Sequence, residues 1–175
     1  MKIRKAVCAD IEAVAQLYAD VHTAEESGQI TVGWQRGIYP ERSTAEAALE
    51  RGDLFVQEED GRIVGAAIIN QQQVDVYAQA RWQYPADDEG VMVLHTLVIA
   101  PSLSRRGYGR AFVAYYEAFA RANGCRCLRM DTNARKTRAR RLYRALGYRE
   151  ADVVPCVFQG LRNVELVLLE KEIEE

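Results

Sequence analysis

Residues 97–110 read Leu-Val-Ile-Ala-Pro-Ser-Leu-Ser-Arg-Arg-Gly-Tyr-Gly-Arg and join an apolar run to an amphipathic segment through a basic turn. A helix is predicted to begin near Gly107, because aromatic residues follow at helical spacing: Phe112, Tyr115, Tyr116 and Phe119. The first N–H groups of a helix have no partner inside it, and the helix dipole places partial positive charge there. The arginines add full charges, so this turn is predicted to bind phosphate.

The glycines of the turn identify which phosphate-binding motif it resembles. Gly107 and Gly109 are followed by Arg-Ala-Phe, which matches neither the Lys-Ser/Thr pair of a P-loop nor the third glycine of a dinucleotide fingerprint. The turn instead resembles the acyl-CoA-binding motif of the GNAT superfamily of N-acetyltransferases, roughly Val-x-Pro-x-x-Gln/Arg-x-x-Gly-x-Gly/Ala. Ile99 and Pro101 also fit this motif, whereas Ser104 stands at its Gln/Arg position.

Residues 128–148 resemble the fifth strand and fourth helix of the same superfamily. Tyr143, followed by Leu-Gly-Tyr at 146–148, fits the family signature Tyr-x-x-Leu-Gly-Phe/Tyr, whose tyrosine lies near the thioester sulfur. This resemblance implies that Tyr143 is the general acid for the departing thiolate, although its helix also carries an apolar stripe in which a tyrosine can simply pack. Lys136 occupies the usual place of a cofactor-binding asparagine, so Asn133 or Lys136 is the expected substitute.

The resemblance implies direct transfer of an acyl group, most often acetyl, from acetyl-CoA to a primary amine in a ternary complex. The attack builds negative charge on the thioester oxygen, and the N–H of Val98 or Ile99 is the expected donor to it. The complete set of expected cofactor-binding residues is Leu97, Val98, Ile99, Arg105, Arg106, Gly107, Tyr108, Gly109, Arg110, Asn133, Lys136 and Tyr143.

The general base has several candidates. By strand alternation, His95 shares a face with Val93 and Leu97, although a strand histidine is commonly a hydrogen-bonded core residue. Glu89 begins the same strand, and Glu25 or Glu26 follows the first helix. The carboxylates could act through water, so the catalytic candidates are Tyr143, His95 and Glu89.

The acceptor pocket is expected between the first helix and second strand and between the third and fourth strands. Both segments carry aromatic residues, whose alternative role is packing at the surface or in a dimer. These inserts favour a small-molecule amine over a protein lysine or amino terminus. The expected substrate-binding residues are Glu25, Trp34, Tyr39, Tyr77 and Trp82.

Composition predicts a single domain over residues 1–175. The chain has 175 residues, is 49% hydrophobic and carries a net charge of −2, which gives no overall attraction to nucleic acid. We find no signal-length apolar stretch and no run near the ~20 residues of a membrane span. The four cysteines lack metal-ligand or redox spacing. We therefore expect a cytoplasmic protein with reduced thiols, no metal and no membrane partner.

Residue patterns predict the element order strand-helix-helix-strand-strand-strand-helix-strand-helix-strand-strand, which is the GNAT order. The expected fold is α/β, with a mostly antiparallel sheet of six or seven strands, flanked by about four helices and splayed between strands four and five. A capping box of Ser43 with Glu46 is predicted to start the second helix, and a hairpin is predicted at residues 59–62.

Two other functions are compatible with the sequence. The run of basic residues at 135–144 is typical of a nucleic-acid contact, of a solvated helix face, or of one or two contacts with the cofactor's 3′-phosphate. A degenerate family member that binds acyl-CoA without catalysis is the second alternative. A homodimer also stays open, since dimers are frequent in the family.

Overall fold

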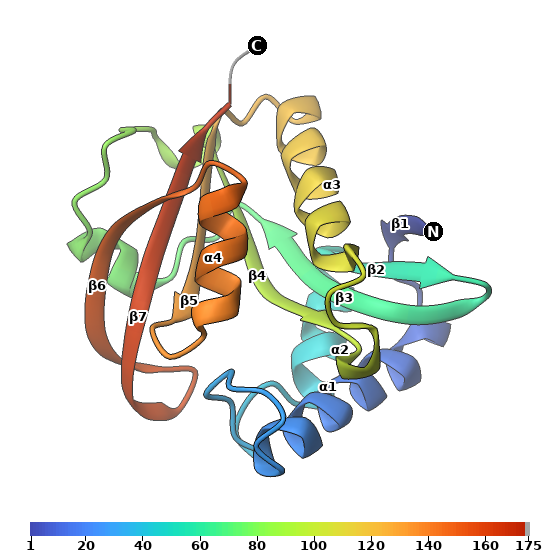
Figure 1. Ribbon diagram of the computed structural model, residues 1–175. Coiled ribbons are helices and arrows are strands. Elements are labelled where there is room, and N and C mark those ends of the chain that lie inside the picture. Colours follow the sequence, from blue (N-terminus) through green and yellow to red (C-terminus); the bar gives the residue numbers. More distant parts are fainter. Residues whose placement is uncertain (174–175) are drawn as a thin grey trace.

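A seven-stranded sheet forms the centre of the computed structural model, which describes residues 1–173 (Figure 1). Its spatial order is β1-β2-β3-β4-β5-β7-β6, and every neighbouring pair is antiparallel except β4 and β5. The strands are β1 (Lys2–Lys5), β2 (Leu54–Glu59), β3 (Arg62–Asn70), β4 (Val91–Ile99), β5 (Cys127–Asn133), β6 (Arg149–Phe158) and β7 (Leu161–Glu172). The expected mixed sheet is therefore confirmed, with seven strands.

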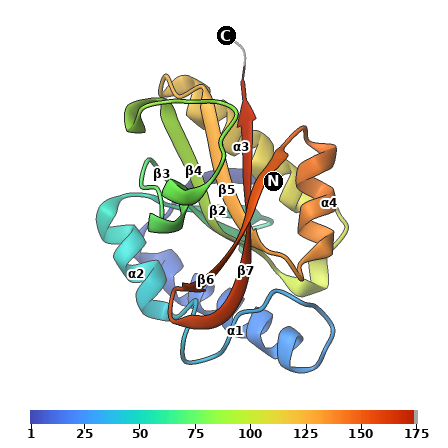
Figure 2. The same ribbon diagram turned by 90° about the vertical axis from the view of Figure 1, so that its left-hand side faces the viewer.

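Four α-helices of residues 1–173 cover the two faces of this sheet: α1 (Ile11–Glu26), α2 (Arg42–Arg51), α3 (Tyr108–Ala122) and α4 (Thr137–Ala145). Apolar side chains of α1 and α2 pack with Val56 and Ile68, whereas α3 and α4 pack with Phe55 and Ala67 on the other face. Neighbouring strand residues point to opposite faces, so each strand serves both cores. Figure 2 shows α2 and α4 on opposite sides of the sheet. None of the described helices is long and apolar enough to cross a membrane.

The parallel strands β4 and β5 stay paired over only part of their length. Their register runs from Val91 opposite Cys127 to Leu94 opposite Met130. Beyond it, β4 continues along β3 to Ile99 and β5 continues along β7 to Asn133, so the strands diverge (Figure 1). This divergence leaves one edge of each strand without a backbone partner strand, as expected for the GNAT fold.

A bulge in β4 corrects the predicted strand face. The register with β3 shifts between Ala66 and Ile68, and Thr96 has a left-handed φ of 51°. Leu97 consequently joins Leu94 in the core beneath α3, rather than sharing a face with Val93 as strict alternation predicted. A single extra residue reverses the facing of all residues after it.

The predicted Ser43 cap of α2 is also wrong. The helix begins at Arg42, and the hydroxyl of Thr44 accepts the N–H of Glu41 at 3.0 Å. The Glu41 carboxylate accepts the N–H of Gly37 at 2.7 Å, so it closes the preceding loop. Glu41 is the N-cap and keeps an extended backbone, with φ of −119°, so the helix starts two residues earlier than a Ser43 cap allows. The predicted hairpin between β2 and β3 is confirmed.

Candidate active site

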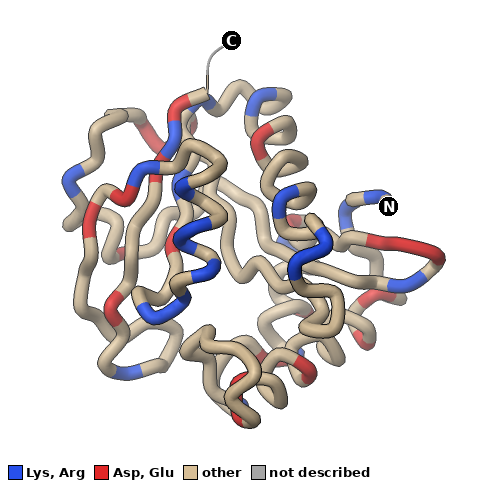
Figure 3. Tube along the Cα trace, in the orientation of Figure 1, with Lys and Arg blue, Asp and Glu red and all other residues tan. Residues whose placement is uncertain are grey.

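The basic turn before α3 presents open backbone donors. Gly107 has φ of +87° and precedes the helix, whose first backbone bond runs from the N–H of Ala111 to the carbonyl of Gly107 at 2.9 Å. The N–H groups of residues 108–110 therefore precede the helical bonding pattern. The hydroxyl of Ser104 donates to the carbonyl of Pro101 at 2.8 Å and closes the short turn upstream. Figure 3 shows Lys and Arg both at this turn and along α4.

A cavity of about 610 Å³ extends from this turn to the start of α4. Most of the cofactor-binding residues expected from the sequence line it: Leu97, Val98, Ile99, Arg105, Gly107, Tyr108, Gly109, Arg110, Lys136 and Tyr143. Arg106 is exposed outside this lining, and Asn133 lines a neighbouring cavity instead. The hydroxyl of Tyr108 donates a hydrogen bond to the Glu59 carboxylate. The backbone N–H of Tyr108 is therefore the group that this residue offers to a ligand at the turn.

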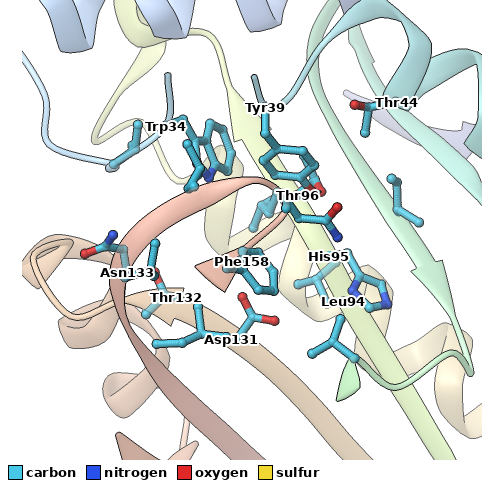
Figure 4. A pocket seen from close by; sticks show the side chains of 18 of the residues that line it. Trp34, Tyr39, Thr44, Leu94, His95, Thr96, Asp131, Thr132, Asn133 and Phe158 are labelled. Carbon is cyan, nitrogen blue, oxygen red and sulfur yellow. Dashed lines mark hydrogen bonds between the residues drawn. The ribbon is translucent and has the colours of Figure 1, made fainter. Parts of the chain in front are cut away.

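The neighbouring cavity, of about 500 Å³, lies where β4 and β5 diverge. Trp34, Tyr39 and Phe158 contribute aromatic walls, drawn from the loop after α1 and from the end of β6 (Figure 4). The two cavities share five lining residues, among them Lys136 and Tyr143. Tyr143 therefore lies at the junction of a cavity that begins at an anion-binding turn and a cavity walled by aromatic rings.

Tyr143 is buried within α4, and burial raises the pKa of its hydroxyl above the ordinary value, with a smaller contribution from the charge of Asp131. Its ring packs edge-on against Tyr148 at 6.1 Å between centroids. A hydroxyl with a raised pKa stays protonated at neutral pH and can donate to a developing anion.

The backbone of β4 offers a donor at the divergence. The N–H of Ala100 donates to the carbonyl of Val64 on β3 at 2.9 Å. Successive N–H groups of a strand point to opposite edges, so the N–H of Ile99 faces the edge that β5 has left, and that of Val98 faces β3. Of the two oxyanion donors expected from the sequence, this geometry favours Ile99.

Lys136 lies between the cavities, at the start of α4. Its Nζ is 5.0 Å from the centroid of the Trp34 ring, a cation–π arrangement that holds the loop after α1 against α4. Burial lowers the pKa of Lys136 to about 8, although the charges of Glu25 and Asp131 oppose the shift. Near neutral pH a fraction of this side chain is uncharged.

His95 lines the aromatic-walled cavity as a neutral ring. Its Nε2 lies 3.0 Å from Oδ1 of Asn70, whose Nδ2 donates to Asp53 at 2.7 Å. Because Asp53 fixes the orientation of the amide, Nε2 of His95 carries the hydrogen. Burial lowers the pKa of His95 to about 4, so the imidazole is uncharged at physiological pH.

Asp131 in β5 is a cavity residue that the sequence analysis did not select. Within residues 1–173, it is the only Asp or Glu that lines the aromatic-walled cavity. Burial raises the pKa of its carboxyl to about 6, while the hydroxyl of Tyr77, which donates to Oδ2 at 2.8 Å, acts in the opposite direction. Asp131 stands in the strand sequence Cys-Leu-Arg-Met-Asp-Thr-Asn, and its place within a predicted strand was the available sequence signal.

Several sequence-predicted residues lie elsewhere. The Glu25 carboxylate accepts the N–H groups of Val32 and Gly33 and shapes the loop after α1, outside both cavity linings. Glu89 is exposed in a short turn before β4, and its carbonyl accepts from the Gln71 side chain at 2.7 Å.

Tyr77 and Trp82 line a third cavity, within the insert between β3 and β4. The indole N–H of Trp82 donates to the carbonyl of Tyr77 at 2.9 Å, and the Arg129 guanidinium lies 4.3 Å from the Trp82 ring centroid. Of the five expected substrate-binding residues, Trp34 and Tyr39 line the aromatic-walled cavity.

A basic turn with open N–H groups, joined to a cavity at diverging parallel strands, is the arrangement that the resemblance to acyl-CoA-dependent transferases implies. Residues 12–148 match the family model described as the acetyltransferase (GNAT) family. The chain therefore belongs to the GNAT acetyltransferase family. Among curated protein sequences, none matches it significantly.

Solved structures share the fold at low sequence identity. A GNAT-family acetyltransferase from Streptococcus agalactiae superposes with a TM-score of 0.82 and 21% identity, over 99% of this chain and 96% of that one. The ribosomal-protein-alanine N-acetyltransferase of Brucella melitensis gives 0.73 and 20%, over 99% and 100%. The yncA protein of Salmonella typhimurium, crystallised with its cofactor acetyl-CoA, gives 0.67 and 19%, over 100% and 95%.

Proposed function

We propose that this protein transfers the acetyl group of acetyl-CoA to the primary amine of a small molecule, by direct attack in a ternary complex. The observation that carries the proposal is the junction of the two cavities at Tyr143 and Lys136. The turn before α3 would hold the cofactor's diphosphate through its open N–H groups, with Arg105 and Arg110 nearby. The thioester would then lie at the junction.

The residues at the junction suit the chemical step. The N–H of Ile99 would stabilise the developing oxyanion, a contribution of ~2.7–4 kcal/mol when one such donor is removed from other acyl-transfer sites. The protonated Tyr143 would give its proton to the departing thiolate. The acceptor amine would attack from the aromatic-walled cavity.

A small acceptor is favoured over a protein because the cavity is walled on several sides. Trp34 and Tyr39 cover it from the loop after α1, and Phe158 covers it from the β6–β7 hairpin. Two of the structurally similar proteins are named as N-acetyltransferases of ribosomal-protein alanine, so a peptide amino terminus is the second candidate acceptor.

The basic run of α4 is partly neutralised within the fold. Arg140 and Arg144 both pair with Glu150, at 2.7 and 3.6 Å, and Lys136 is directed to Trp34. These contacts disfavour nucleic-acid binding as the main function, because paired cations have less free charge for phosphates.

The test is calorimetric titration with acetyl-CoA, dephospho-CoA and ATP, followed by acetylation assays on a panel of amines. We expect saturable binding that prefers acetyl-CoA, and thiol release that depends on an added amine. Absence of acetyl-CoA binding would overturn the cofactor assignment. Binding without turnover of any amine or peptide would instead identify a non-catalytic acyl-CoA-binding protein.

A further inference from the structure

We propose that Asp131 is the anchor for the acceptor's ammonium group and the first recipient of its proton, which makes small, strongly basic alkylamines the substrate class. This inference rests on the proposed acetyl transfer. It assigns a catalytic role to a carboxylate of β5.

The placement of the carboxylate carries the argument. Asp131 follows Met130, the last β5 residue that pairs with β4, so it stands where the two strands begin to diverge. Figure 4 shows its carboxylate directed toward the middle of the cavity, between Phe158 and Leu94. Oδ2 accepts from Tyr77, whereas Oδ1 has no hydrogen-bond partner within residues 1–173. One oxygen is thus held in place and the other is available to a ligand.

The charged and titratable groups around Asp131 come from several elements. Burial raises the pKa of the hydroxyls of Tyr39 and Tyr143, and the charge of Asp131 adds to both increases. The charge of Lys136 in turn lowers the pKa of Asp131 slightly, against the larger effect of burial. Burial raises the pKa of the Cys156 thiol on β6, and the charge of Asp131 adds to this increase. His95 of β4 lines the same cavity as a neutral ring. Leu168 is the partner of Asp131 on β7. Among the residues that the structure describes, Asp131 is therefore the only anionic side chain that an ammonium group would meet on this lining.

The proton balance follows from these positions. The ammonium group gives one proton to Asp131, and the neutral amine attacks the thioester carbon while the C–S bond breaks. Tyr143 protonates the leaving thiolate and is reprotonated by the second proton released from the acylated nitrogen. The proton on Asp131 passes to solvent, so the sum is ammonium plus acetyl-CoA giving amide, CoA thiol and one proton. A carboxyl whose pKa is raised toward neutrality is suited to accept and release that proton.

The surroundings define the body of the acceptor. Trp34, Tyr39 and Phe158 offer ring surfaces near the carboxylate, which favour an apolar or aromatic group beside the amine. Hydrogen bonds to a charged group contribute ~1.5–3 kcal/mol, a factor of roughly 10 to 150 in affinity. An uncharged amine lacks the attraction between opposite charges and therefore gains less from the carboxylate.

The experiment compares two probes on purified wild-type protein and on Asp131→Asn. 2-Phenylethylamine is protonated at neutral pH, whereas aniline is uncharged. We expect kcat/KM for 2-phenylethylamine to fall about 10- to 100-fold in the variant, and that for aniline to change less than about threefold. The affinity for acetyl-CoA, measured by calorimetry, should be unchanged. Asp131→Glu should recover part of the loss, because it restores a carboxylate.

Asp152→Asn is the matched control, since Asp152 of β6 pairs with Arg81 of the insert and lies outside the lining of the aromatic-walled cavity. Equal losses for both probes in Asp131→Asn, or no loss for either, would overturn the proposal. Binding of 2-phenylethylamine to the acetyl-CoA complex is measured separately by calorimetry. If wild-type protein binds this probe through Asp131 without acetylating it, the proposed function fails and the anchor stands. If wild-type protein binds acetyl-CoA but not this ammonium probe, the anchor fails.

Discussion

Tyr143 combines two properties that a general acid requires. It lines both cavities, so its hydroxyl lies where a thioester sulfur would meet the acceptor side. Burial raises the pKa of that hydroxyl, which keeps the proton in place until a strong base such as a thiolate develops nearby. Removal of the hydroxyl alone therefore tests its chemical role.

We expect Tyr143→Phe to lower kcat by ~10²- to 10⁴-fold, the usual contribution of a positioned acid. Acetyl-CoA affinity should change little, because the ring and its packing on Tyr148 remain. Steady-state kinetics and calorimetry on the same preparation measure the two quantities. Tyr148→Phe is the control: its hydroxyl donates to Glu117 at 3.0 Å, outside both cavities, and full activity is expected. A fully active Tyr143→Phe enzyme would reduce Tyr143 to a packing residue.

For single residues, the sequence correctly predicted those cavity-lining positions that belong to a short local motif. Tyr143 and Gly107 belong to motifs within single short segments, and both line the expected cavity. Asp131 was missed because its role depends on burial by distant segments, among them Tyr77 of the insert and Phe158 of β6. Glu25 was selected for its charge, yet that charge holds the backbone of residues 32 and 33.

The start of α3 is the element at which we expect the cofactor's diphosphate to bind. Gly107 has a left-handed backbone, and a Cβ built there meets no protein atom within 4 Å. The space beside it is therefore open to a ligand, and the conformation itself costs a residue with a side chain ~1–2 kcal/mol.

Gly107→Val should therefore lower both acetyl-CoA affinity and stability. We expect at least a tenfold weaker Kd and a loss of ~1–2 kcal/mol in unfolding free energy, measured by calorimetry and urea denaturation. Gly107→Asn separates the effects, because asparagine tolerates the left-handed region while still placing a side chain near the ligand. Its stability should stay near wild type and its affinity should fall. Wild-type affinity in both variants would exclude this turn from the binding site.

Element order was predictable, whereas strand register was not. Amphipathic spacing and turn residues are local, and they placed β4 and the β2–β3 hairpin correctly. The bulge at Thr96 arises from pairing with β3, whose partner residues come from a different part of the sequence. For that reason, the face of the sheet on which Leu97 lies could not be predicted from the sequence and is seen only in the structure.

Across the whole molecule, the divergence of β4 and β5 provides a site and also costs stability. Asp131 and His95 lie where side chains from several elements bury them, and both have pKa values shifted toward the uncharged form. Groups of this kind couple folding to pH in opposite directions. The shifted carboxyl of Asp131 destabilises the fold when ionised, and the shifted imidazole of His95 destabilises it when protonated.

The folded pKa of Asp131, about 6, exceeds its ordinary value of 3.8, so between these values the folded state binds more protons than the unfolded state. Its contribution to stability is therefore present at low pH and is lost as pH rises through about 6. Asp131→Asn mimics the protonated carboxyl and keeps an acceptor for Tyr77. We expect the variant to be more stable than wild type at pH 8, by on the order of 2–3 kcal/mol at most, with the difference vanishing near pH 4.

Urea denaturation of wild type and Asp131→Asn between pH 4 and pH 8 measures the difference in their unfolding free energies. The opposite contribution of His95 cancels in this difference, because both proteins contain His95. Asp152→Asn, which removes a half-buried carboxylate paired with Arg81, should show no gain at pH 8. A variant that is less stable than wild type at pH 8 would mean that the Asp131 carboxylate is a net stabilising group. The expected result, more stability with less activity, would identify Asp131 as a charge retained for chemistry at the expense of the fold.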